Sequence, residues 1–282
     1  MPNWCYSRLT VVGNIVQRIK FLNDVTVSNL LDETEYVDRK VQLAQSIVPM
    51  PPALEGTRSP APTEPVNKRF GELLQAGEIS EQQYQEYMTE HAVAWQKAQW
   101  ARTTTGFDNW YDWCNEFWGT KWGDCNSSVL THDEQETVIT FETAWCPFDD
   151  SFMDRLGQRW PSLLFYTTST EESRAYVAFH AVKGDRSVCA SSDIPSPPDH
   201  IWEIEDEDQK YAEIDVWNDD WENQWFDSQL QIMHDELEEG PVYVSSSKSG
   251  GSRDVASCGV VSEFDARSAD CVGVVSDSQS HD

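Results

Sequence analysis

Negative charge is concentrated in one segment of this chain. The 282 residues include 49 Asp and Glu against 20 Lys and Arg, a formal net charge of −29 at pH 7. Residues 201–240 alone hold 15 of these acids and a single lysine. Charge at this density costs folding free energy through self-repulsion, and it repels DNA, RNA and anionic membranes. It therefore favours a basic partner over direct nucleic-acid binding. The alternative is that the acids only keep a Trp-rich protein soluble.

Aromatic residues limit how much of the chain can be disordered. The 13 Trp, 11 Phe and 9 Tyr can supply a sizeable core, for one large domain or two small ones. The seven Cys form no C-x-x-C pair, and the first residues show neither the basic nor the apolar segment of an export signal. No apolar run approaches the roughly 20 residues of a membrane span. We therefore expect reduced thiols, a cytoplasmic location and no membrane contact.

Strand and helix signals alternate through the first 200 residues. The chain is expected to begin with a strand over 4–12 and a helix capped by Asn14. A largely helical insertion over about 23–106 follows, and it includes a capping box at Ser80-Glu-Gln-Gln83. The remaining expected elements, in chain order, are a helix over 108–118, a hairpin of 128–132 with 137–143, a helix over 149–160, and a hairpin of 163–168 with 174–182. This order predicts an α+β domain over 1–200, with a ferredoxin-like split β-α-β antiparallel sheet.

The remaining residues divide into an extension and a tail. A turn-rich spacer at 191–198 precedes an acidic, Trp-rich extension over 201–240. We expect a strand pair there, 201–205 with 210–217, followed by a helix that begins at Asp219 and ends near Glu239. Residues 241–282 are rich in Ser, Gly and Asp, and we expect this tail to be disordered.

Sequence motifs give little support to an enzyme. There is no Walker loop, no G-x-G-x-x-G, no H-E-x-x-H and no G-x-S-x-G. The six His are scattered, and none stands at metal-ligand spacing with Cys. We therefore expect no catalytic residues, no bound metal and no cofactor.

One aromatic segment is open to two interpretations. Lys121 stands between Trp118 and Trp122 in a Gly-Thr-Lys turn directly after a helix. A cation stacked on indole would suit an exposed recognition patch, which could also include Trp4 and Trp145. The other interpretation, which we favour, is a helix end with both Trp side chains packed on the sheet.

Three motifs together resemble the YubB ferredoxin-like family, whose members are encoded on bacterial plasmids and phages. They are residues 2–13 (PNWCYSRLTVVG), 118–122 (WGTKW) and 141–147 (FETAWCP), and the resemblance covers 1–22 and about 107–190. The family usually has Pro where this chain has Phe148, and often a Gly-rich turn at 173–175. The resemblance implies a ferredoxin-like fold in a mobile-element protein, and it supplies no established catalytic residues.

Three functions remain open on these grounds. The first is a phage or plasmid accessory protein that binds and inhibits a basic, nucleic-acid-handling host defence protein through an acidic surface that mimics DNA. The second is an enzyme or small-ligand-binding protein with a site at Trp4, Trp118, Lys121, Trp122 and Trp145. The third is an acidic, non-inhibitory scaffold. For the first function, the expected partner-binding residues are Glu203, Glu205, Asp206, Glu207, Asp208, Asp215, Asp219, Asp220, Glu222 and Asp227.

Overall fold

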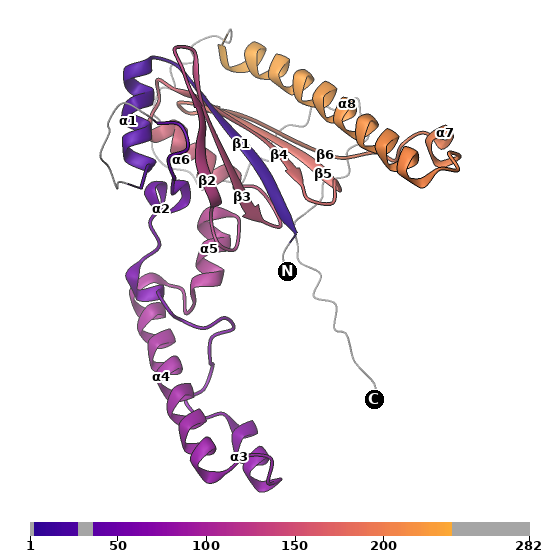
Figure 1. Cartoon of the computed structure of the whole chain (residues 1–282). Helices are drawn as coiled ribbons and strands as arrows, with labels where there is room; N and C mark the ends of the chain where they lie inside the picture. Colours follow the sequence, from indigo (N-terminus) through magenta and orange to yellow (C-terminus); the bar gives the residue numbers. More distant parts are fainter. Residues whose placement is uncertain (1–2, 28–35, 239–282) are drawn as a thin grey trace, which may run out of the picture. The chain divides into compact units, whose positions relative to one another are not determined.

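Alternating burial along the first strand sets the two faces of a single sheet. In β1 (Trp4–Val12), Leu9 and Val11 are buried on one face, while Tyr6 and Arg8 are exposed on the other. The computed structural model describes residues 3–27 and 36–238, which form a mixed α+β fold around this sheet (Figure 1).

The sheet has six strands in the order β2-β3-β1-β4-β5-β6, and every neighbouring pair is antiparallel. The other strands are β2 (Cys125–His132), β3 (Glu136–Ala144), β4 (Leu164–Glu171), β5 (Tyr176–Lys183) and β6 (Arg186–Asp193). The expected pairing of the 4–12 strand with the 137–143 strand is confirmed, because β1 pairs with β3 along its whole length. Strand β6 was not predicted from the sequence. It is polar, and none of its residues is fully buried, so it lacks the alternation that marks a strand.

Four helices cover one face of the sheet (Figure 1). They are α1 (Ile15–Val25), α2 (Leu43–Ile47), α5 (Trp110–Trp118) and α6 (Asp150–Arg159). Phe21 of α1 and Phe152 of α6 are fully buried in the same core as Ile139 and Phe165 of the sheet. Asn14 caps α1 through its side chain, as the sequence predicted, and Asp149 caps α6 in the same way. The main core therefore lies between the sheet and these helices.

A buried arginine joins α1 to the acidic turn between β2 and β3. Arg18 is fully buried, and its guanidinium donates to the backbone carbonyls of Gly13, Asp133 and Glu134 and to the Thr137 hydroxyl. Burial lowers the pKa of Arg18 from its ordinary value. These four acceptors satisfy a charge that would otherwise be costly to bury.

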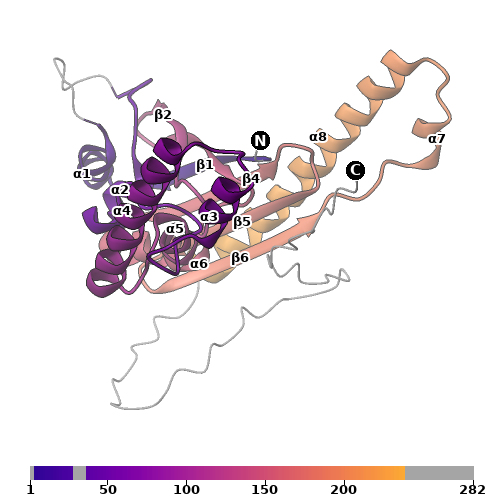
Figure 2. The same ribbon diagram turned by 90° about the horizontal axis from the view of Figure 1, so that it is seen from below.

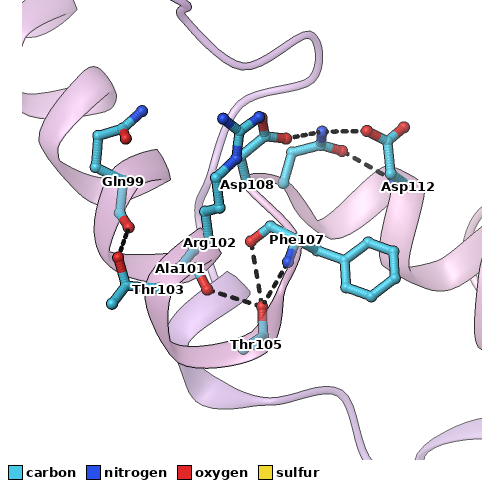
Figure 3. Close-up of polar contacts among 9 residues, drawn as sticks. Gln99, Ala101, Arg102, Thr103, Thr105, Phe107, Asp108 and Asp112 are labelled. Carbon is cyan, nitrogen blue, oxygen red and sulfur yellow. Dashed lines mark hydrogen bonds and ion pairs between the residues drawn. The ribbon is translucent and has the colours of Figure 1, made fainter.

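The segment between α1 and β2 also contains the 3-10 helix η1 (Pro52–Leu54), α3 (Lys68–Gln75) and α4 (Glu81–Thr105). The capping box at Ser80 and Gln83 is confirmed. The end of α4 is held to the start of α5 by polar contacts (Figure 3). Arg102 forms an ion pair with Asp108 at 2.6 Å, and the Thr105 hydroxyl bonds the backbone of Ala101 and of Phe107.

The strand pair expected over 201–217 is wrong. This region forms α7 (Asp199–Trp202) and α8 (Glu207–Met233), which continues as a π-helix, η2 (His234–Glu238). The Asp206 side chain accepts a hydrogen bond from the Gln209 backbone N–H and so caps α8, whereas Asp219, where the helix was expected to begin, lies inside it. Ile, Val, Tyr and Trp favour strands locally, but here the helical cap and packing of the helix on the sheet override that preference. The tail expected at 241–282 lies outside the described residues.

Candidate functional site

Helix α8 packs on the sheet along one half only. In its C-terminal half, Phe226, Leu230 and Met233 contact a small core that includes Leu164 and Phe179 of the sheet, on the face opposite α1 and α6. Residues 199–217, which comprise α7 and the N-terminal part of α8, extend past the ends of the strands (Figure 2). We call residues 199–217 the acidic overhang.

The overhang exposes both charge and apolar surface. It contains eight carboxylates and one lysine. Trp202, Tyr211 and Val216 are 50, 63 and 57 % exposed. Six of the ten predicted partner-binding acids are exposed here: Glu203, Glu205, Asp206, Glu207, Asp208 and Asp215. Exposed aromatic residues among charges are typical of protein-binding surfaces.

Three of these six acids also stabilise the helix that carries them. Asp206 is the N-cap, and Glu207 and Asp208 occupy the first turn of α8, where negative charge interacts favourably with the helix dipole. A change at these positions would alter the helix as well as its surface. Glu205, Glu213 and Asp215 are exposed acids of the overhang without such a role.

Two other predicted acids, the exposed Asp219 and the half-buried Glu222, pair with an arginine at the point where α8 crosses the turn between β4 and β5. Arg174 in that turn contacts Asp219 at 2.7 Å and Glu222 at 3.6 Å. Glu222 also accepts a hydrogen bond from Thr170, and burial raises its pKa above the ordinary value despite these partners. Asp219 and Glu222 therefore attach α8 to the sheet. Asp220 and Asp227 are exposed on the C-terminal half.

The turn that presents Arg174 is itself held by a buried carboxylate. Glu171 is 3 % exposed and accepts hydrogen bonds from the Ser173 backbone and hydroxyl and from the Ala175 backbone. Arg174 adopts a left-handed backbone with φ of 57°, which a non-glycine residue rarely does. This arrangement fixes the direction in which the guanidinium approaches α8.

The aromatic segment divides between core and surface. Trp118 is 5 % exposed, packs against Trp113 and donates its indole N–H to the Val48 carbonyl. Trp122 is 40 % exposed, so the expectation that both Trp side chains pack on the sheet is right for Trp118 and wrong for Trp122. The reason is the turn: Gly119, directly after Trp118, has a positive φ and ends α5, and Gly123, directly after Trp122, also has a positive φ, so the chain changes direction after each indole.

The other residues of the predicted patch, Trp4, Trp122 and Trp145, lie together with Lys121 at the surface. Its Nζ lies 4.5 Å from the Trp122 ring centroid and 5.1 Å from that of Trp145, and the Trp4 and Trp122 centroids are 6.0 Å apart. Trp145 is 44 % exposed, and its backbone φ is 69°. The cation–π position between these rings is thus already filled by a lysine of the same chain.

A groove that the sequence did not single out lies on the open part of the sheet beside α8. It has a volume of about 350 Å³, and its walls include Tyr6 and Arg8 of β1 and Thr140 and Glu142 of β3. The signal was available in the strand over 4–12, where an aromatic and a basic residue occupy alternate positions opposite the buried face.

Residues 3–27 and 36–238 lack two further kinds of site. No group of three or more His, Cys, Asp or Glu side chains there is placed to hold a metal ion. No helix in the same ranges combines the length and apolar character needed to cross a bilayer.

Comparisons with known proteins do not assign this chain to a family. No family model matches the sequence, and no curated protein matches it. Among solved structures it is similar to protein api92 from Yersinia pseudotuberculosis, described with the family designation DUF1281, at 14 % identity. The match covers 70 % of this chain and 100 % of the other, with a TM-score of 0.38. At this TM-score the similarity supports no conclusion on fold or function.

Proposed function

We propose that this protein binds and inhibits a basic, nucleic-acid-handling protein of a bacterial host, and that the acidic overhang is the surface that does so. The observation that carries the proposal is the exposure of acids and large apolar side chains together on a segment that extends past the sheet. The resemblance to plasmid- and phage-encoded proteins supports a role in a mobile element.

Charge explains the choice of partner. Eight carboxylates on 19 residues create a negative potential that accelerates encounter with a positive surface. A surface that normally neutralises the phosphates of DNA, spaced at about one charge per 1.7 Å of duplex axis, is complementary to such an array.

Exposed apolar side chains supply the affinity that charge alone does not give: those of Trp202, Tyr211 and Val216. Acids alone would give fast but weak and salt-sensitive association, because exposed ion pairs are screened. Aromatic residues that become buried on binding contribute most of the affinity in many protein interfaces. The overhang therefore combines steering by charge with apolar anchors.

The fold proposed to carry the overhang is a ferredoxin-like core, β1-α1-β2-β3-α6-β4, with β1 between β3 and β4. The strand order and the antiparallel pairing support this assignment. In it, β5, β6 and the α7–α8 extension are additions that follow β4, and α2 to α4 form the insertion expected over about 23–106, which α5 follows.

A displacement experiment tests the function. Host lysate is bound to DNA-cellulose, and the column is eluted with the full-length protein at low salt. We expect release of a discrete basic protein, and no release by the variant E205K/E213K/D215K. The matched control, E72K/E78K/E86K, changes the net charge equally at exposed acids of α3, α4 and the loop between them, and it should release the same protein. Equal loss in both variants would show that only total charge matters and would contradict a defined surface.

A further inference from the structure

The groove beside α8 is built from two cross-strand rows, and the first is centred on an arginine. Arg8 of β1 pairs with Thr140 of β3 on one side and with Thr168 of β4 on the other. It is exposed, and the ion pairs found among the described residues do not include it. In a chain with 49 acids, an arginine without a carboxylate partner at the centre of a sheet is available to an external oxyanion. The two threonine hydroxyls can donate to the same oxyanion.

The second row is centred on a tyrosine. Tyr6 pairs with Glu142 of β3 and with Thr170 of β4. Its side chain is 49 % exposed in the wall of the groove. Glu142 accepts one hydrogen bond from Asn126, at 2.7 Å, which orients its carboxylate at this edge of the groove. The row therefore offers an aromatic surface with a fixed hydrogen-bond acceptor beside it.

We infer that this groove binds a nucleoside monophosphate, with the base on Tyr6 and the phosphate on Arg8. Tyr6 and Arg8 are two residues apart on one strand, a separation of about 7 Å, which a single nucleotide spans between base and phosphate. Bases stack on exposed aromatic rings, and phosphates bind arginine and threonine side chains. Glu142 accepts a hydrogen bond from an amino group, which adenine, guanine and cytosine carry and uracil lacks.

A single nucleotide fits this groove better than a nucleic-acid strand. Glu142 stands on one side of Tyr6, and Glu222 of α8 contacts Thr170 on the other. These carboxylates and the overall charge of −29 repel the further phosphates of a longer chain. The inference is independent of the acidic overhang, because the lining residues come from the sheet.

Isothermal titration calorimetry with the full-length protein tests the site. The probes are the monophosphates of guanosine, adenosine, cytidine and uridine, guanosine without phosphate, and a single-stranded RNA hexamer. We expect the three amino-bearing nucleotides to bind more tightly than uridine monophosphate, and guanosine about tenfold more weakly than its monophosphate, because a charged hydrogen-bond pair is lost.

Variants separate the contributions of the two rows. R8Q and Y6L should each weaken guanosine monophosphate binding about tenfold, and E142Q should reduce the preference over uridine monophosphate. R58Q, an exposed arginine outside the groove, is the matched control and should bind normally. Absence of binding by every monophosphate, or binding unchanged in R8Q and Y6L, would overturn the inference. Tighter binding of the hexamer than of any monophosphate would also overturn it, in favour of a nucleic-acid surface.

Discussion

The two halves of α8 are similar in composition and different in role. Both are rich in Asp, Glu and Trp, but Met233 in the C-terminal half is 1 % exposed while Tyr211 in the N-terminal half is 63 % exposed. Among the acids, Glu222 of the C-terminal half contacts Arg174 and Thr170, whereas Glu213 and Asp215 of the N-terminal half are exposed, as are Asp220 and Asp227. The C-terminal half of this continuous acidic helix thus packs on the sheet and serves as an anchor. The N-terminal half extends past the sheet and remains a free surface.

The largest expected effect is the loss of the anchor. Met233→Ala removes a buried side chain from the core between α8 and the sheet and should lower the free energy of unfolding by about 2–5 kcal/mol. Val216→Ala, in the overhang, should change it by no more than about 0.5 kcal/mol. Denaturant unfolding of both variants measures the difference, and equal effects would contradict the division of the helix into halves.

The contact between α8 and the β4–β5 turn should have an intermediate effect. Arg174→Met leaves Glu222 without its cation and should cost about 1–3 kcal/mol. The double variant R174M/E222Q should recover part of this loss, because the remaining side chain is then neutral. Denaturant unfolding of the two single variants and the double variant gives the coupling, and strictly additive losses would show that the ion pair does not hold the helix.

Two carboxylates should respond to pH with opposite signs. The hydrogen bond from His180 lowers the pKa of Asp150, so its contribution is present above the ordinary Asp range and is lost as pH falls through the lowered pKa. Burial raises the pKa of Glu222, so the folded state gains stability relative to E222Q as pH falls through that raised value. Thermal melts between pH 3 and 7 check this. D150N should be destabilised at neutral pH only, and a pH-independent difference would contradict the assignment.

The smallest expected effect on stability comes from the overhang itself. Each charge reversal in E205K/E213K/D215K should change the free energy of unfolding by no more than about 0.5 kcal/mol, because the side chains are exposed and neither cap the helix nor pair with Arg174. A fourth reversal, D206K, should add about 1 kcal/mol through loss of the N-cap. Thermal melts of the triple and quadruple variants measure this step.

Local signals predicted local structure well. The strand at 4–12, the caps at Asn14 and Ser80 and the antiparallel hairpins are all visible in the sequence, because each depends on neighbouring residues. The part of α8 before Asp219 was missed although its cap, Asp206 with Gln209, is also local, because strand-forming side chains at 210–217 suggested a strand.

The features that the sequence did not predict depend on contacts between residues far apart in the chain. The pairing of Asp219 and Glu222 with the sheet depends on Arg174, which is 45 residues before Asp219 in the chain. The sequence therefore identified the acidic region but could not separate its anchoring acids from its exposed ones. The same holds for Trp118 and Trp122, whose burial depends on how the intervening turn meets distant residues.

The most direct test of the central claim is the association rate with the protein released from DNA-cellulose, measured by stopped flow from low to high salt. We predict a fast rate for the wild-type chain that falls steeply with salt, and a slow, nearly salt-independent rate for E205K/E213K/D215K. The control E72K/E78K/E86K should remain close to the wild-type chain. An undiminished rate for the overhang variant would contradict the claim that the free half of α8 is the binding surface.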